Sequence, residues 1–244
     1  MNKFGLVVIG AYSGIWLTPL LKKYENQKII LVEPVPYNIL LLKENTAKYN
    51  NVKIETSAVS GTKEIKKFYF VKSNAIKKLG KHWASGIGSF NKQHILNHAN
   101  NRFLVTDSDI DEIDIQYVTF LDLIEKYSIF SIDLLQIDVE GAEFEILNSI
   151  DFEKIFIKKI IFEFKHFDGT FKEGPKLKLI KEKLINSNYS ITEIDKENIL
   201  AEKKFTDHYC EECIKEDESV SHNLILTGFK ICNSCKISKT IFPI

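Results

Sequence analysis

Carboxylates that follow apolar runs are the side chains best placed for chemistry in most of this chain. Glu33 follows the run at residues 28–32, and Asp138 follows the run at residues 132–137. Both runs are typical of buried parallel strands, and the carboxyl ends of such strands meet at the sheet edge where α/β proteins bind ligands. We therefore expect Glu33 and Asp138 to lie at one ligand-binding site.

Cysteines form a second group with a chemical spacing. The chain has four, all near its end and arranged as two CxxC pairs: Cys210, Cys213, Cys232 and Cys235. Two such pairs are the spacing of a structural Zn²⁺ site with four thiolate ligands, with disulfides or free thiols as the alternatives. We expect a small zinc-ribbon-like tail at residues 205–244, with a hairpin at residues 223–231, after a larger domain at residues 1–204.

A glycine-bearing turn joins the first apolar run to the first predicted helix. Gly10 and Gly14 are spaced as GxxxG, and not as the GxGxxG of dinucleotide-binding folds. Glycine lets the backbone approach a ligand closely, and a helix start favours polar ligand groups. Together with Glu33, which can accept both hydroxyls of a ribose, the turn indicates an adenosyl group without a pyrophosphate. The alternative is that Glu33 is a solvated strand end before Pro34.

Strand and helix patterns alternate along most of the larger domain, which predicts right-handed βαβ units and a parallel sheet. Strands are predicted at residues 4–9, 28–32, 52–56, 132–137, 159–164 and 189–194. Helices are predicted at residues 15–24, 37–49, 118–127, 142–147 and 175–185.

The pattern loosens between residues 61 and 114, where only residues 64–71 are typical of a further strand. We expect either a mobile cover of a binding site or a partly disordered insertion that shapes a ligand pocket, with Trp83 available to stack on a sugar or another ring. His94 and His98 have the i,i+4 spacing of helical metal ligands. The sequence indicates no third ligand for them, so we expect a solvated helix face.

The charge balance disfavours one class of partner. The chain has 33 Lys and Arg against 33 Asp and Glu, and Arg102 is its single arginine. This neutrality disfavours binding of nucleic acid by bulk charge, and the acidic residues near Cys210 disfavour nucleic acid at the tail. No apolar run approaches the ~18 residues of a membrane span, and the first run is too short for a secretion signal. We expect a cytoplasmic protein with no membrane contact.

Several motifs, in order along the chain, are similar to those of one known family. They read Val-Ile-Gly-Ala-Tyr-Ser-Gly at 8–14, Val-Glu-Pro-Val-Pro-Tyr-Asn at 32–38 and Leu-Gln-Ile-Asp-Val-Glu-Gly-Ala-Glu at 135–143, with shorter matches at 57–60, 118–122 and 160–163. The chain thereby resembles the FkbM-type family of S-adenosylmethionine-dependent methyltransferases over most of its length. Members of that family generally lack a cysteine tail.

The resemblance implies a class I Rossmann-like α/β fold, with a mostly parallel seven-stranded sheet, an antiparallel last strand and helices on both faces. It implies S-adenosylmethionine as the cofactor, with Gly10 and Gly14 at the methionine part, Glu33 at the ribose and Ala58 at the adenine. The same motifs add three residues to the cofactor site: Ala11, Pro34 and Asp138. Family members usually carry an acid two residues before the first glycine, where this chain has Val8.

Methyl transfer from a sulfonium is an in-line displacement that needs alignment more than acid–base power. An alcohol acceptor must still lose a proton, so a base near the methyl group is useful. We expect Asp138 beside the methyl group and the acceptor. Two further catalytic candidates are Glu163, which ends the next strand, and His166, which could serve as a base. The alternative is that His166 is an ordinary surface residue in a loop. Glu143 lies in the first turn of a predicted helix, where a carboxylate stabilises the helix dipole with or without a ligand.

The sequence therefore predicts a methyltransferase that moves the methyl group of S-adenosylmethionine to an oxygen of a sugar or another small hydroxyl compound. Two alternatives stay open. One is a non-catalytic or weakly catalytic module of the same fold that binds a protein partner through the tail. The other is a protein or RNA methyltransferase guided by the zinc tail, although the scarcity of arginine disfavours RNA.

Overall fold

The structure is a computed structural model that describes residues 2–80, 82–99, 103–139, 141–168, 174–206 and 208–241, without the side chains of residues 82, 83, 240 and 241. The expected stacking role of Trp83 lies outside the described side chains. Contacts within the chain divide it into two compact units, Met1–Glu202 and Lys203–Ile244.

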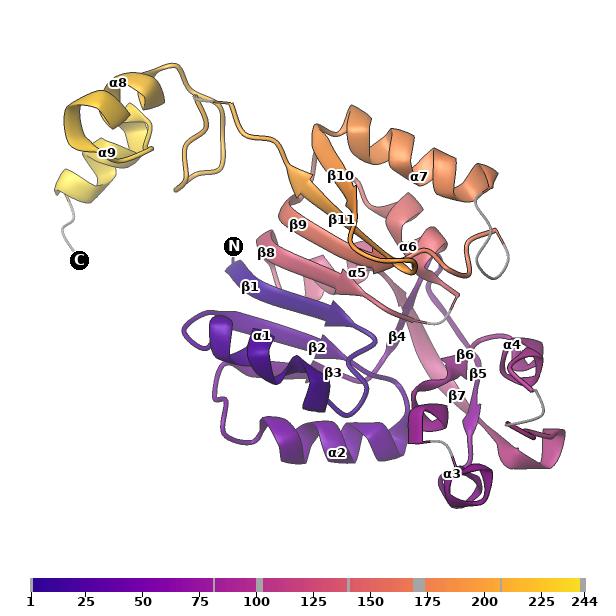
Figure 1. Cartoon of the computed structure of the whole chain (residues 1–244). Coiled ribbons are helices and arrows are strands. Elements are labelled where there is room, and N and C mark those ends of the chain that lie inside the picture. The colour runs from indigo at the N-terminus through magenta and orange to yellow at the C-terminus, as the bar shows by residue number, and fades with distance from the viewer. Residues whose placement is uncertain are drawn as a thin grey trace. The chain divides into compact units, whose positions relative to one another are not determined.

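A seven-stranded sheet forms the centre of the first unit, in the order β10-β11-β9-β8-β1-β2-β3 (Figure 1). Its strands are β1 (Asn2–Ile9), β2 (Lys28–Val32), β3 (Val52–Glu55), β8 (Ile129–Ile137), β9 (Phe156–Glu163), β10 (Tyr189–Glu193) and β11 (Asn198–Lys203). The pairs β1–β2, β1–β8, β2–β3 and β8–β9 are parallel, and β11 runs antiparallel to β9. The prediction of a mostly parallel seven-stranded sheet is confirmed.

The two faces of this sheet bury different side chains because successive residues of a strand point to opposite faces. Along β1, Leu6 and Val8 are buried on one face, and Val7 and Ile9 on the other. The first face packs against α1 (Thr18–Lys23), the 3-10 turn Ile15–Leu17 and α2 (Pro36–Thr46). The second packs against α5 (Phe120–Lys126), α6 (Glu143–Ser149) and α7 (Pro175–Asn186). Helices therefore cover both faces, and Val8 belongs to the apolar core.

A second sheet is inserted between β3 and α5, in the order β4-β7-β5-β6. Its strands are β4 (Ala58–Ser60), β5 (Glu64–Val71), β6 (Gly88–Ser89) and β7 (Ile110–Thr119), and its helices are α3 (Ser73–Leu79) and α4 (Lys92–Asn97), with 3-10 turns at His82–Gly86 and Asp107–Asp109. The strand predicted at residues 64–71 is confirmed, and it pairs antiparallel with β7. The helix predicted from residue 118 begins at Phe120 instead, after a capping box formed by Thr119 and Asp122.

The second unit consists of an isolated bridge between Tyr209 and Glu216, α8 (Ser219–Thr227) and α9 (Asn233–Ile241). The hairpin predicted at residues 223–231 is wrong, because Ser219–Thr227 is helical up to the left-handed Gly228, at φ +76°. The side-chain amide of Asn223 donates to the carbonyl of Ile231 at 2.9 Å and so fixes the segment after the helix. Cys210 and Cys213 therefore lie before α8, Cys232 lies between the two helices and Cys235 lies on α9, with no β-ribbon among the described residues. Among the described helices of both units, none has the length and apolarity to cross a membrane.

Candidate active site

Backbone hydrogen bonds join the carboxyl ends of four strands of the central sheet. The amide of Asp138 donates to the carbonyl of Ile9 at 2.9 Å, and that of Gly10 donates to the carbonyl of Val32 at 3.0 Å. One strand further, the amide of Glu33 donates to the carbonyl of Glu55 at 3.0 Å. Gly10, Glu33 and Asp138, which lie far apart in the sequence, therefore meet at one edge of the sheet.

A pocket of about 530 Å³, including its open mouth, lies at this edge. Five of the residues singled out in the sequence line it: Gly10, Glu33, Pro34, Ala58 and Asp138. The inserted sheet and its turns supply a further set of lining residues: Phe68, Gly86, Gly88, Ser89, Phe90 and Tyr117. Sequence reasoning missed this second set, although the alternation of apolar and polar residues at 113–117 is a strand signal.

Glu33 lines this pocket and is buried, with 5% of its surface exposed. One carboxylate oxygen accepts from the amide of Tyr12 at 2.9 Å, and the other accepts from the amide of Val35 at 2.9 Å and from the side chain of Asn38 at 3.4 Å. Burial raises the pKa of Glu33 to about 7, and these hydrogen bonds oppose the rise. A carboxylate has about four acceptor positions, so it can still accept from a ligand hydroxyl.

Close packing and a left-handed backbone require glycine at both glycine positions of the turn. Gly10 has φ +92°, and a Cβ atom there would lie 1.6 Å from the carbonyl oxygen of Asp138. Gly14 has φ +76°, and a Cβ atom there would lie 2.6 Å from a methyl carbon of Leu42. Gly14 and the fully buried Ala11 are not among the lining residues of the pocket. Gly10 is therefore the one of these three that borders the pocket.

The insertion is fastened to the loops around Glu33. The hydroxyls of Tyr12 and Ser85 are hydrogen-bonded to each other, and the side-chain amide of Asn38 donates to the carbonyl of Ser85 at 2.8 Å. The hydroxyl of Tyr37 donates to the carbonyl of Val71 at 2.8 Å. These bonds hold the insertion against the glycine turn and α2, which makes one wall of the pocket.

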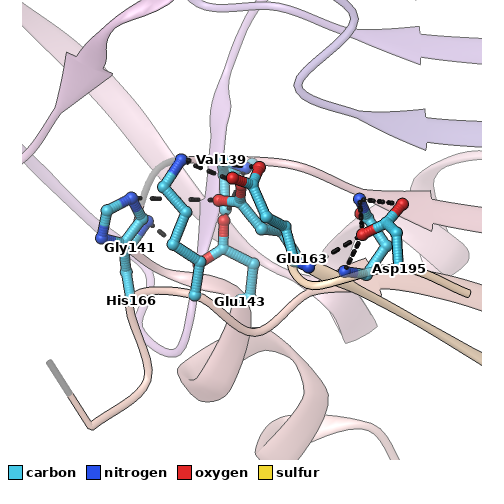
Figure 2. Close-up of polar contacts among 9 residues, drawn as sticks. Val139, Gly141, Glu143, Glu163, His166 and Asp195 are labelled. Carbon is cyan, nitrogen blue, oxygen red and sulfur yellow. Dashed lines mark hydrogen bonds and ion pairs between the residues drawn. The ribbon is translucent and has the colours of Figure 1, made fainter. Parts of the chain in front are cut away.

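Glu143 holds the loop that carries Asp138. Its carboxylate accepts from the amide of Val139 at 2.8 Å and from the amide of Gly141 at 2.9 Å, as Figure 2 shows. Burial raises the pKa of Glu143 to about 8, the hydrogen bond from the amide of Val139 opposes the rise, and the neighbouring charges of Glu163 and Asp138 add to it. Glu143 does not line the pocket, so its contacts make it a support for the loop.

Glu163 and His166 lie beside these acids and outside the lining of the pocket. Carboxylate oxygens of Asp138, Glu143 and Glu163 all lie within 4.8 Å of one another. Glu163 has one oxygen 4.0 Å from Nε2 of His166 and the other 3.3 Å from the ammonium of Lys165 (Figure 2). Asp138 is therefore the exposed end of a group of acids that leads to His166.

His94 and His98 do not form a solvated helix face. Both are half-buried, and His166 lies beside them, with ligating nitrogens of the three rings within 4.8 Å of one another. The expectation that they have no third companion is wrong, because the fold brings the loop after β9 to the end of α4.

The four cysteines converge within the second unit. Their sulfur atoms lie within 4.8 Å of one another, with Cys210 and Cys232 buried. Sγ of Cys213 lies 3.8 Å from Sγ of Cys232, and the amide of Cys232 donates to Sγ of Cys210 at 3.2 Å. Zinc bonded to sulfur at 2.3 Å in a tetrahedron separates its ligands by about 3.8 Å, so this donor set fits a Zn²⁺ ion.

The family of the chain follows from a direct comparison. The family model described as the methyltransferase FkbM domain matches residues 9–204, which is most of the chain. The chain therefore belongs to the FkbM family of S-adenosylmethionine-dependent methyltransferases, as the motifs indicate. No curated protein gives a significant match.

Solved structures with a similar outline share little sequence with this chain. The fibrillarin pre-rRNA processing protein of Methanococcus jannaschii is 11% identical, with 84% of this chain and 68% of that chain covered and a TM-score of 0.43. The precorrin-6y C5,15-methyltransferase of Geobacter metallireducens is 14% identical, with 83% and 82% covered and a TM-score of 0.40. TrmK of M. capricolum, in complex with S-adenosyl-homocysteine, is 14% identical, with 97% and 75% covered and a TM-score of 0.40.

Proposed function

We propose that the first unit binds S-adenosylmethionine in the pocket between Glu33 and Asp138 and transfers its methyl group to an oxygen of a sugar or another small hydroxyl compound. The observation that carries the proposal is the convergence of Gly10, Glu33 and Asp138 on one pocket in a chain of the FkbM family.

The residues present fit this cofactor. Glu33 has an acceptor position left for a ribose hydroxyl, and the backbone of Gly10 borders the pocket. Ala58, Phe68 and Tyr117 make an apolar wall for the adenine. The bound cofactor supplies an electrophilic methyl group on a sulfonium. The chain contributes alignment, and the exposed carboxylate of Asp138 orients the acceptor hydroxyl and accepts its proton.

Replacing Glu33 with glutamine should weaken the binding of S-adenosylmethionine about 10- to 100-fold, because the charge-assisted hydrogen bonds to the ribose are lost. Hydroxyl donors favour the ionised carboxylate, and the pKa of Glu33 in the free protein is about 7. Affinity should therefore rise between about pH 6 and about pH 8 in the native chain, and the Glu33→Gln variant should lose this component.

Calorimetry over this pH range measures both effects, and the difference between the two chains removes the titration of the cofactor itself. Glu44→Gln, an exposed glutamate on α2, is the matched control and should bind as the native chain does. Equal affinity of the native chain and Glu33→Gln at pH 8 would contradict the cofactor site.

Replacing Asp138 with asparagine should lower the turnover of methyl transfer by about 100-fold or more, because the variant cannot accept the acceptor proton. Transfer of a labelled methyl group to a panel of monosaccharides and small alcohols measures the rate. Asp133→Asn, on the same strand and paired with Lys3 at 3.4 Å, is the control and should keep its activity. A turnover unchanged by Asp138→Asn would remove Asp138 from the reaction.

We propose separately that the second unit holds one structural Zn²⁺ ion through Cys210, Cys213, Cys232 and Cys235. The spacing of the two CxxC pairs and the convergence of the four sulfurs support this site. Two of these cysteines are part of a very small buried cluster, so the ion would supply most of the stability of the unit.

A further inference from the structure

Three histidines form a compact group at the edge of the insertion. The rings of His94 and His98 have centroids 4.9 Å apart, those of His94 and His166 are also 4.9 Å apart, and those of His98 and His166 are 6.0 Å apart. His94 lies on α4, His98 is the residue that ends it, and His166 follows β9. The group therefore joins the insertion to the central sheet of the same unit.

The nitrogens are arranged as a metal would need them. Ligating nitrogens of the three rings lie within 4.8 Å of one another, and zinc bonded to nitrogen at 2.0–2.1 Å brings its ligands to about 3.3 Å. Binding would therefore require the rings to turn toward one another. The Nε2 atoms of His94 and His166 are buried, so a bound ion would be shielded from water on that side.

Two neighbouring groups also favour the binding of a metal ion. Nδ1 of His98 lies 2.9 Å from the carbonyl oxygen of His94, and a hydrogen bond from Nδ1 directs the lone pair of Nε2 toward a metal. An oxygen of Glu163 lies 4.0 Å from Nε2 of His166, with both side chains 9% exposed, and this carboxylate offsets the charge of a cation. Plain packing of three imidazole rings requires neither of these features.

We propose that His94, His98 and His166 bind a divalent transition-metal ion of the kind that prefers imidazole, such as Zn²⁺. Three protein ligands leave a fourth position for water or another ligand. The ion would clip α4 of the insertion to the end of β9. His94 lies 3.8 Å from the Cβ position of Gly141, so the clip also borders the loop that carries Asp138.

The proposal is independent of the methyltransferase assignment, because it concerns the binding of metal alone. It has one consequence for the reaction. A metal ligand has no lone pair left for a proton at the ligating nitrogen, so His166 would position the insertion, and the proton of the acceptor would be left to Asp138.

The test counts zinc in the full chain after the thiolate site has been removed. The variant Cys210→Ser with Cys213→Ser should still bind about one zinc per chain, measured by elemental analysis and by calorimetric titration with Zn²⁺. Adding His98→Ala or His166→Gln to this variant should abolish that binding. Adding His222→Ala, an exposed histidine outside the group, should leave it unchanged.

Thermal unfolding gives a readout that shows whether each variant is folded. Zinc should raise the midpoint of the cysteine variant and should not raise that of the variant that also lacks His98, while both unfold cooperatively without metal. A cysteine variant that is folded and binds no zinc would overturn the proposal. So would zinc binding that is unchanged by both His98→Ala and His166→Gln.

Discussion

Replacing Gly10 with alanine should destabilise the first unit by at least about 3 kcal/mol, as measured by chemical denaturation. A Cβ atom at this position would lie 1.6 Å from the carbonyl oxygen of Asp138, and the backbone has φ +92°, which L-residues rarely adopt. The clash is with backbone, so no side-chain rotation relieves it. The ends of β1 and β8 would have to separate at the point where the pocket opens.

Gly80→Ala is the matched control for this substitution. Gly80 also has a left-handed backbone, with φ +65°, but a Cβ atom there meets nothing within 4 Å. This control isolates the cost of placing an L-residue in the left-handed backbone conformation, which is about 1 kcal/mol. Equal losses of stability in the two variants would show that the contact with Asp138 contributes nothing, and would contradict the packing described for the pocket edge.

Removing the thiolates of the second unit should produce the other large effect. In Cys210→Ser with Cys213→Ser, or after removal of zinc with a chelator, the amides of the second unit should lose their protection from hydrogen exchange. The buried cluster of this unit contains Cys210, Val220 and Cys232, which is too little apolar surface to fold the unit without metal. Amides of the central sheet should exchange as before, because that sheet belongs to the other unit.

Ile225→Ser serves as the control within the same unit. Ile225 lies on α8 and is 83% exposed, so its replacement should leave both the zinc content and the exchange pattern unchanged. Elemental analysis of the native chain is the companion measurement. Full protection of the second unit in the cysteine variant, or a native chain free of zinc, would contradict the structural zinc site.

The strands at the edge where the pocket opens were predictable because they lie between two helical layers. β1 and β2 contain nearly continuous apolar runs, and β8 and β9 are apolar runs interrupted by a few polar residues, which is how parallel strands between two helical layers appear in a sequence. The acids Glu33 and Glu163 then follow at the ends of such runs. Position relative to an apolar run is a local property, so local sequence is enough to find it.

The insertion was not predictable in the same way. β7 has a polar face and pairs with β5, 39 to 53 residues earlier in the chain. β11 of the central sheet was missed for a similar reason, because only Ile199 and Ala201 are buried in it. Strands of this kind depend on their partners more than on their own hydrophobicity. The tail shows a different error: the predicted hairpin begins at Asn223, which lies in the helix Ser219–Thr227, and Val220 of this helix packs against Cys210 and Cys232, far from it in the sequence.

The sequence by itself determined the family, the parallel sheet and two sets of candidate functional residues, the acids at strand ends and the four cysteines. Apolar runs, motifs and CxxC spacing are local patterns of the sequence, so no knowledge of the fold is needed to find them. The tertiary structure decided which of those residues share a site. Gly10 is required because the backbone of Asp138 packs against it, and Glu143 is buried beneath the loop it supports. The group formed by His94, His98 and His166 exists only because the chain folds back on itself, since contacts between distant residues leave no spacing in the sequence.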